Sequence, residues 1–152
     1  MVLKKTKLNI KITKVYNPLI ILFLNKLQKQ GNKNNSEKIL NEIFLFLKQK
    51  GFLKPEIALE RAIFKLKLPI ILKSKIIGGT IYKIPVRINF KQSISNAISL
   101  FLESSKQNKT IKISKACYFE IINILNDKGN SIFKVQNLLK QALSLRVFST
   151  FY

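Results

Sequence analysis

Two alternating segments joined through Gly78-Gly79 constrain the fold of this chain more than any other feature. Alternation of apolar and polar residues is typical of a β-strand, and a Gly-Gly pair between two such segments is typical of a tight hairpin turn. The pattern predicts a β-ribbon over about residues 70–88. Because an isolated two-stranded ribbon is marginal in water, one of its faces must pack against another part of the chain.

The alternation also predicts that the ribbon has one apolar face and one cationic face. The apolar face is expected to carry Ile70, Leu72, Ile76, Tyr82, Ile84, Val86 and Ile88. The cationic face is expected to carry Lys73, Lys75, Lys83 and Arg87. With the apolar face packed, the cationic face remains available to phosphate. The ribbon is therefore a candidate nucleic-acid-binding element.

The rest of the chain has apolar residues at helical spacing in six segments. Caps, prolines and glycines mark several of their ends. The expected starts are Asn17-Pro18, Ser36, Pro55 and Ser131, and the expected ends are Gly31, Gly51, Pro69 and Asp127-Lys128-Gly129. The sequence therefore predicts a mainly α fold, a six-helix domain with one β-hairpin ribbon inserted between helices three and four. Residues 1–16 are expected to form a basic N-terminal arm, and residues 17–152 a single helical domain.

The net charge limits the class of partner. The chain has 28 basic and 7 acidic residues, which gives a net charge of +21. Such repulsion favours a polyanionic partner, with nucleic acid first and an anionic membrane surface second. Nearly all of the positive charge is lysine, which binds phosphate as a point charge and lacks the bidentate fork that reads base edges. Recognition of backbone and shape is therefore favoured, although an AT-rich genome would also enrich Lys, Asn and Ile.

Catalytic and cofactor sites are hard to build from this set of residues. The chain has no histidine, the usual general base near neutral pH, and its one cysteine, Cys117, lies on an apolar stripe as an inert core thiol would. Glu56 and Glu60 are one helical turn apart, but acids in a first helical turn are more simply explained by the helix dipole. We therefore expect no enzyme activity, no metal site and no cofactor.

The ribbon resembles the signature of a known family. Lys73-Ser74-Lys75, Gly78-Gly79, Tyr82 and Ile84-Pro85-Val86 are similar to the motif of small-subunit ribosomal protein seven, in its bacterial-type form. That family has six helices with one β-ribbon between the third and fourth, which is the order predicted above. The similarity covers nearly the whole chain and also includes Lys14-Val15-Tyr16-Asn17, Ala58, Glu60, Ala62, Glu103, Glu120, Lys128-Gly129, Ala142 and Phe148.

The resemblance implies a structural constituent of the small ribosomal subunit that binds the 3′ major domain of its rRNA and nucleates head assembly. It also implies that the ribbon lies near the exit-site tRNA and the mRNA exit path, with neighbouring small-subunit proteins as further partners. Carried over by position, RNA contact falls to the basic arm, the loop before helix two, the ribbon and the entrance to helix four. The residues are Lys4, Lys5, Lys7, Lys11, Lys33, Lys73, Lys75, Lys83, Arg87, Lys91 and Gln92.

The chain departs from the family pattern at several cationic positions. Ile76 stands where the family usually has a second basic residue, Gln92-Ser93 replaces a basic pair, and Ser99 replaces an arginine of helix four. Reduced organellar rRNAs would explain the loss of cationic contacts at these positions. Residues 113–121 are especially similar to mitochondrial members. These features indicate a mitochondrial ribosome, with a plastid ribosome as second choice. Because the chain ends nearly coincide with those of the family, we expect no cleaved import sequence and synthesis inside the organelle.

Two other classes of binding protein are compatible with the composition. A basic amphipathic protein could lie on an anionic membrane surface through helix one and the arm, although this leaves the ribbon unexplained. A DNA-packaging or helix-turn-helix protein would need an arginine-bearing recognition helix, and none stands out. The longest apolar run, over residues 18–24, is too short to span a bilayer.

Overall fold

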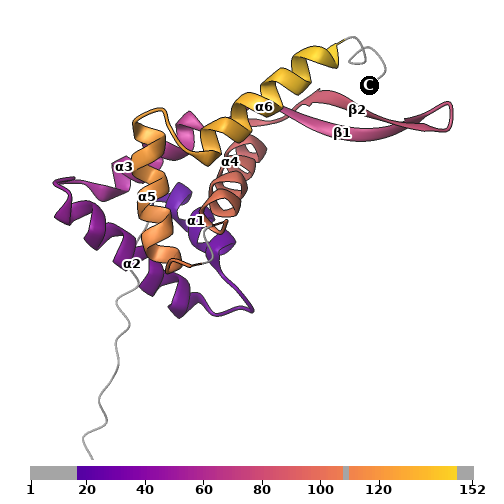
Figure 1. Cartoon of the computed structure of the whole chain (residues 1–152). Coiled ribbons are helices and arrows are strands. Elements are labelled where there is room, and N and C mark those ends of the chain that lie inside the picture. The colour runs from indigo at the N-terminus through magenta and orange to yellow at the C-terminus, as the bar shows by residue number, and fades with distance from the viewer. Residues whose placement is uncertain (1–16, 108–109, 147–152) are drawn as a thin grey trace, which may run out of the picture.

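Helices and strands follow one another in the predicted order. The computed structural model describes residues 17–107 and 110–146, so the predicted arm over residues 1–16 lies outside the described residues. The elements are α1 (Pro18–Leu27), α2 (Lys33–Gln49), α3 (Pro55–Lys65), β1 (Ile70–Ile77), β2 (Thr80–Arg87), α4 (Phe90–Ser105), α5 (Ile113–Leu125) and α6 (Asn130–Ser144). The mainly α fold with a ribbon between the third and fourth helices is thus confirmed. Figure 1 shows the ribbon projecting from the helical body beside α6.

One hydrophobic core holds the first five helices together. The rings of Phe23 on α1 and Phe101 on α4 are fully buried and lie 5.9 Å apart between centroids. Other large side chains buried to about this degree within the helical body include Ile20, Leu40, Ile43, Leu47, Leu59, Ile63, Leu66, Ile98, Ile121 and Ile124. The predicted apolar stripes of α1 to α5 are therefore faces of this core. The stripe of α6 is buried only in part, since Val135 belongs to the core while Leu139 is 38% exposed.

The starts of α2 and α6 differ from the predicted caps. Asn32 caps α2, because its side chain accepts a hydrogen bond from the Asn35 N–H at 3.2 Å. Ser36 was predicted at this place, but it lies buried in the first turn. An asparagine caps a helix as well as a serine does, so the earlier polar residue starts the helix. Ser131 is likewise not a cap, since α6 begins at Asn130.

The end of α1 also differs from the prediction. The helix ends at Leu27, and Gln28 already has extended backbone angles of φ −60° and ψ 135°. Gly31, the predicted end, lies in the turn that leads to α2, with φ +76°. By contrast, Pro18 and Pro55 stand in the first turns of α1 and α3 as predicted, where a missing N–H costs nothing.

The register of the ribbon contradicts the predicted separation into one apolar and one cationic face. Gly78 and Gly79 form a two-residue turn with φ of +58° and +82°, which pairs Ile77 with Thr80. A turn of this length places odd-numbered residues of β1 opposite even-numbered residues of β2, and opposite residues share a face. The observed pairs include Lys73 with Ile84, Lys75 with Tyr82, Ser74 with Lys83, and Ile70 with Arg87. Each face is therefore mixed, and each carries two of the four cations.

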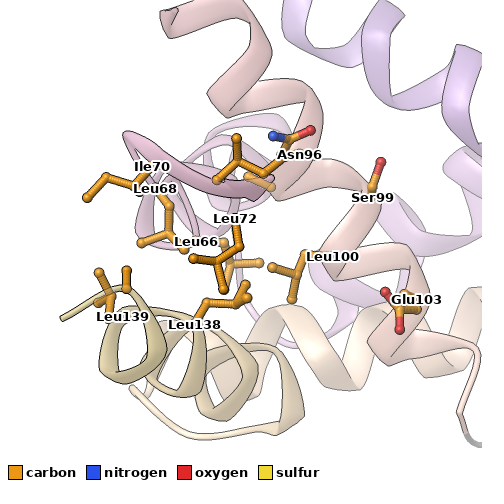
Figure 2. A pocket seen from close by; sticks show the side chains of 13 residues that line it. Leu66, Leu68, Ile70, Leu72, Asn96, Ser99, Leu100, Glu103, Leu138 and Leu139 are labelled. Carbon is orange, nitrogen blue, oxygen red and sulfur yellow. The ribbon is translucent and has the colours of Figure 1, made fainter. Parts of the chain in front are cut away.

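Burial of the apolar side chains differs along the length of the ribbon instead of between its two faces. At its base, Ile84 and Val86 are buried, whereas Ile76 and Ile81 near the turn are 69% and 72% exposed. The base lies over α4 and α6 and closes a cleft of about 260 Å³, lined largely by leucines and isoleucines. Figure 2 shows Ile70 and Leu72 of the ribbon in this cleft, facing Leu100 of α4 and Leu138 and Leu139 of α6. The body thus anchors one end of the ribbon and leaves the other in solvent.

A buried carboxylate fixes the start of α6. Glu120 on α5 is 7% exposed, and its Oε1 accepts hydrogen bonds from the Ser131 N–H at 2.9 Å and from the Ser131 hydroxyl. The carboxylate also faces the positive end of the helix dipole. Gly129 makes this approach possible, because a Cβ there would lie 3.0 Å from Asn123 Cβ and 3.2 Å from Glu120 Oε1. The sequence-based prediction assigned no such role to Glu120.

Replacing Glu120 with alanine should lower the free energy of unfolding by about 1–3 kcal/mol, because the Ser131 N–H and hydroxyl would be left buried without an acceptor. Urea unfolding followed by circular dichroism measures this effect. Glu56→Ala is the matched control, since Glu56 is an exposed acid in the first turn of α3 and should cost less. Equal loss in the two variants would show that Glu120 does not hold α6.

Candidate nucleic-acid interface

The ribbon presents its predicted cations to solvent along its length, from Lys75 and Lys83 in the outer half to Arg87 opposite Ile70 at the base. Lys73, Lys75, Lys83 and Arg87 are all exposed. The register places Lys73 and Lys75 on one face and Lys83 and Arg87 on the other. A phosphate backbone can therefore meet positive charge on either side of the ribbon, which a ribbon with one cationic face would not allow.

Charge is distributed unevenly along the chain. The segment from Arg61 to Leu102, which includes the ribbon, has eight basic residues and no acidic residue. The acids that form ion pairs in the described residues lie elsewhere, where they bridge the helices. The pairs are Glu42 with Lys112 at 2.7 Å, Glu103 with Lys134 at 3.0 Å, and Asp127 with Lys65 at 2.8 Å. Only the last of these pairs takes a cation from the acid-free segment.

The ion pair between α2 and α5 shows how these acids work. Lys112 Nζ donates a hydrogen bond to Glu42 Oε1, and this bond holds the pKa of Glu42 below its usual value. The carboxylate therefore stays ionised at neutral pH and keeps a compensating charge beside Lys112. Acids placed in this way offset repulsion inside the helical body, and none of the three ion pairs described above uses a cation of the ribbon.

The start of α4 extends the cationic surface to the base of the ribbon. Lys91 and Gln92, both predicted to contact RNA, are exposed in the first turn of α4. Two bonds fix this turn to the entrance of the ribbon: the Ile88 N–H donates to the Pro69 carbonyl at 3.0 Å, and the Ser93 hydroxyl donates to the Leu68 carbonyl. The structure therefore brings the predicted ribbon and α4 residues into one surface.

Three residues of this surface were missed by sequence reasoning. Phe90 is 57% exposed, its ring lies 6.5 Å from that of Phe64, and Lys67 Nζ lies 4.3 Å from its centroid. An ammonium over an aromatic face is attracted by the ring quadrupole, so Lys67 is held at the start of α4. The signal available in the sequence was an aromatic residue at an otherwise polar helix start.

One departure from the family pattern is compensated in space. Ser99 stands where the resemblance implies an arginine of helix four. In the structure Lys26 of α1 donates a hydrogen bond from Nζ to the Ser99 hydroxyl. A cation from another helix therefore lies where the arginine is missing. The sequence could not indicate this, because the two residues are far apart in the chain.

Of the remaining predicted contacts, Lys33 alone lies within the described residues, and it is not part of this surface. Lys33 is exposed in the first turn of α2, and Figure 1 shows that end of α2 well apart from the ribbon. The predicted residues Lys4, Lys5, Lys7 and Lys11 lie outside the described residues. The structure thus brings together the ribbon and the α4 residues and leaves Lys33 separate.

The described residues offer little for catalysis or metal binding. Cys117 is buried, and burial raises the pKa of its thiol to about 11, so it stays protonated and unreactive at neutral pH. Glu60 accepts a hydrogen bond from the side chain of Asn17, which ties α3 to the start of α1. Within residues 17–107 and 110–146, no group of three or more His, Cys, Asp or Glu residues could hold a metal ion.

Membrane association through α1 also finds little support. The apolar side chains that it would need, including Ile20, Phe23 and Leu24, are packed in the core. Among the described helices, none combines the length and the apolar character that a membrane crossing requires.

Comparison with known proteins decides which class of nucleic-acid binder this is. A family model described as ribosomal protein S7p/S5e matches residues 2–146. The chain belongs to this family. Among its relatives, small ribosomal subunit protein uS7 of Syntrophus aciditrophicus (strain SB) is 29% identical over 136 residues, which cover 90% of this chain and 87% of the relative. The uS7c protein of Trieres chinensis is 28% identical over 128 residues, 84% of this chain and 81% of the relative.

Membership of the S7p/S5e family confirms the resemblance seen in the ribbon motif. The chain is a ribosomal protein of the small subunit, an RNA-binding structural protein and not an enzyme. The matched residues include all six helices and the ribbon. The relatives come from bacteria and, for uS7c, from a plastid, and uS7 of Pelagibacter ubique (strain HTCC1062) is a further bacterial example, 27% identical over 138 residues, 90% of this chain and 88% of the relative.

The buried position of Cys117 predicts that its thiol reacts only when the protein unfolds. With the folded chain at pH 8, a thiol reagent such as DTNB should label Cys117 at least about 100-fold more slowly than in denaturant, because the pKa near 11 leaves little thiolate and the core blocks access. The release of thionitrobenzoate measures both rates. Rapid labelling of the folded chain would contradict the packing of α5 described above.

Proposed function

We propose that this chain binds the 3′ major domain of the small-subunit rRNA and nucleates assembly of the subunit head. In this role the ribbon is the main RNA-contacting element and lies near the exit-site tRNA and the mRNA exit path. The observation that supports this proposal most is the ribbon itself, with a base packed on α4 and α6 and an outer half that carries exposed cations on both faces. A projection that is anchored at its base suits insertion between RNA segments.

The binding mechanism is electrostatic. Lysines that neutralise phosphates release condensed counterions, so affinity falls as salt rises. The helical body supplies a shaped surface, which suits RNA because its deep major groove hides the base edges and recognition depends largely on shape and backbone. The scarcity of arginine in the chain fits backbone contact better than base reading.

We further propose that the particle is a mitochondrial small subunit. A resemblance of residues 113–121 to mitochondrial members, inferred from the sequence, supports this proposal, as does an enrichment in Lys, Asn and Ile that fits an AT-rich organellar genome. A plastid ribosome is the second choice, and neighbouring small-subunit proteins are expected partners in either case. The alternative of a protein bound to an anionic membrane surface is less favoured, because the apolar face of α1 is packed in the core.

Replacing Lys73, Lys75 and Lys83 with glutamine should make the salt dependence of rRNA binding shallower by about two to three in the slope of log K against log salt. Filter binding to a transcript of the 3′ major domain over a salt series measures the slope. The matched control replaces Lys38, Lys54 and Lys140, three exposed lysines of the helical body, and removes the same charge. If both triple variants change the slope equally, the ribbon has no special place in the contact.

Sedimentation tests the assembly proposed here. Organelle lysate is fractionated on a sucrose gradient with magnesium and again after chelation, with this chain and the small-subunit rRNA followed together. We expect the chain to migrate with the small subunit and to shift when chelation dissociates the particle. A chain found at the top of both gradients, or with membranes, would contradict the proposed function and favour the lipid-surface alternative.

A further inference from the structure

An open hollow lies between α2 and α5, away from the cationic ribbon. It has a volume of about 360 Å³ and is lined by Phe46 and Gln49 of α2, by Lys50 directly after α2, and by Lys115, Tyr118 and Phe119 of α5. Figure 1 shows α2 on the side of the helical body away from the ribbon, and α5 nearer the middle of the body. The volume falls within the range of about 300–1,000 Å³ that is typical of clefts for small ligands.

Aromatic rings form the apolar part of this hollow. The ring of Tyr118 lies 5.7 Å from that of Phe46 and 5.2 Å from that of Phe119, with interplanar angles of 50° and 56°. These contacts limit the movement of the rings. Phe119 is 52% exposed, so part of its ring remains open to a further planar group. A phenylalanine left half in solvent and fixed against a tyrosine is a stacking platform.

The charge around the rings selects an anionic ligand. Lys50 and Lys115 are exposed at the hollow, and among its described lining residues none is acidic. The nearest ion pair between these helices uses Lys112 and Glu42, so Lys115 is not the lysine that Glu42 neutralises. Gln49 adds an exposed amide that can both donate and accept hydrogen bonds. An apolar peptide would gain nothing from these cations, whereas a nucleotide has a planar base for the rings and a phosphate for the lysines.

We propose that this hollow binds one unpaired nucleotide of RNA. The base stacks on Phe119, Lys50 and Lys115 contact the flanking phosphates, and Gln49 meets the edge of the base. Proteins hold unpaired bases in this way, by stacking them on aromatic rings inside a basic surface. The proposal rests on the proposed rRNA-binding function and adds to it a second site, distinct from the ribbon, that takes single-stranded nucleotides.

The test compares two exposed phenylalanines in the full chain. Phe119→Ala removes the platform, while Phe133→Ala removes a side chain on α6 that is 63% exposed and does not line the hollow. The probe is a fluorescently labelled oligouridylate of about twelve nucleotides, within the size range of single-strand sites. We expect Phe119→Ala to weaken its binding about 5- to 100-fold, measured by fluorescence anisotropy, and to leave the salt slope unchanged because stacking releases no counterions.

Further measurements test whether the nucleotide binds at the hollow and distinguish this binding from RNA binding by the ribbon. Lys115→Gln should make the salt slope for the oligouridylate shallower by about one. Binding of an RNA duplex of equal length should be the same in Phe119→Ala and Phe133→Ala, because paired bases cannot enter the hollow. If the two variants bind the oligouridylate equally well, the hollow does not take a nucleotide, even when the rRNA transcript still binds. If the unaltered chain binds neither the oligouridylate nor the rRNA transcript, the proposed function itself fails.

Discussion

Self-repulsion in a chain with a net charge of +21 is the constraint on which the rest of the structure depends. The folded state needs a core large enough to offset that repulsion, and α1 to α5 supply it with fully buried aliphatic and aromatic side chains. The ion pairs are mostly exposed, and such pairs contribute only about 0–1 kcal/mol each. The core therefore holds the fold together, while the positions of the acids chiefly decide where positive charge remains. The longest stretch without any acid runs from Arg61 to Leu102 and includes the ribbon and the start of α4, while exposed lysines such as Lys50 and Lys115 keep further positive charge on the helical body.

Local signals in the sequence were enough to predict the elements, because those signals act over a few residues. Pro18 and Pro55 mark helix starts through the missing N–H, and Gly78-Gly79 marks the turn through its positive φ angles. The errors at Ser36 and Gly31 have the same local origin, since Asn32 competes as a cap and Gln28 leaves the helix before the glycine is reached. Such competition between neighbouring residues shifts an end by a few positions without changing the order of elements.

The ribbon faces show a different kind of error. The alternation within each strand was correctly recognised, but the two strands were combined in the wrong register. The two-residue turn alone determines that Lys73 lies opposite Ile84, so the mixed faces could have been predicted from the sequence. The position of Lys26 beside Ser99, the approach of Glu120 to Ser131 and the Lys67–Phe90 contact could not, because each joins elements whose packing no local pattern determines.

The arrangement of charge and aromatic rings bears on how such a protein takes one orientation on RNA. Lysines contact phosphates without reading sequence, and a ribbon with cations on both faces could bind a phosphate backbone at many positions. Specific placement therefore needs a second contact at a fixed distance from the ribbon. The rigid core between the ribbon and the α2–α5 hollow supplies that distance, because the buried side chains of α2, α4 and α5 belong to a single cluster. A stacked nucleotide there would set orientation while the ribbon supplies affinity, and the two surfaces would respond differently to salt.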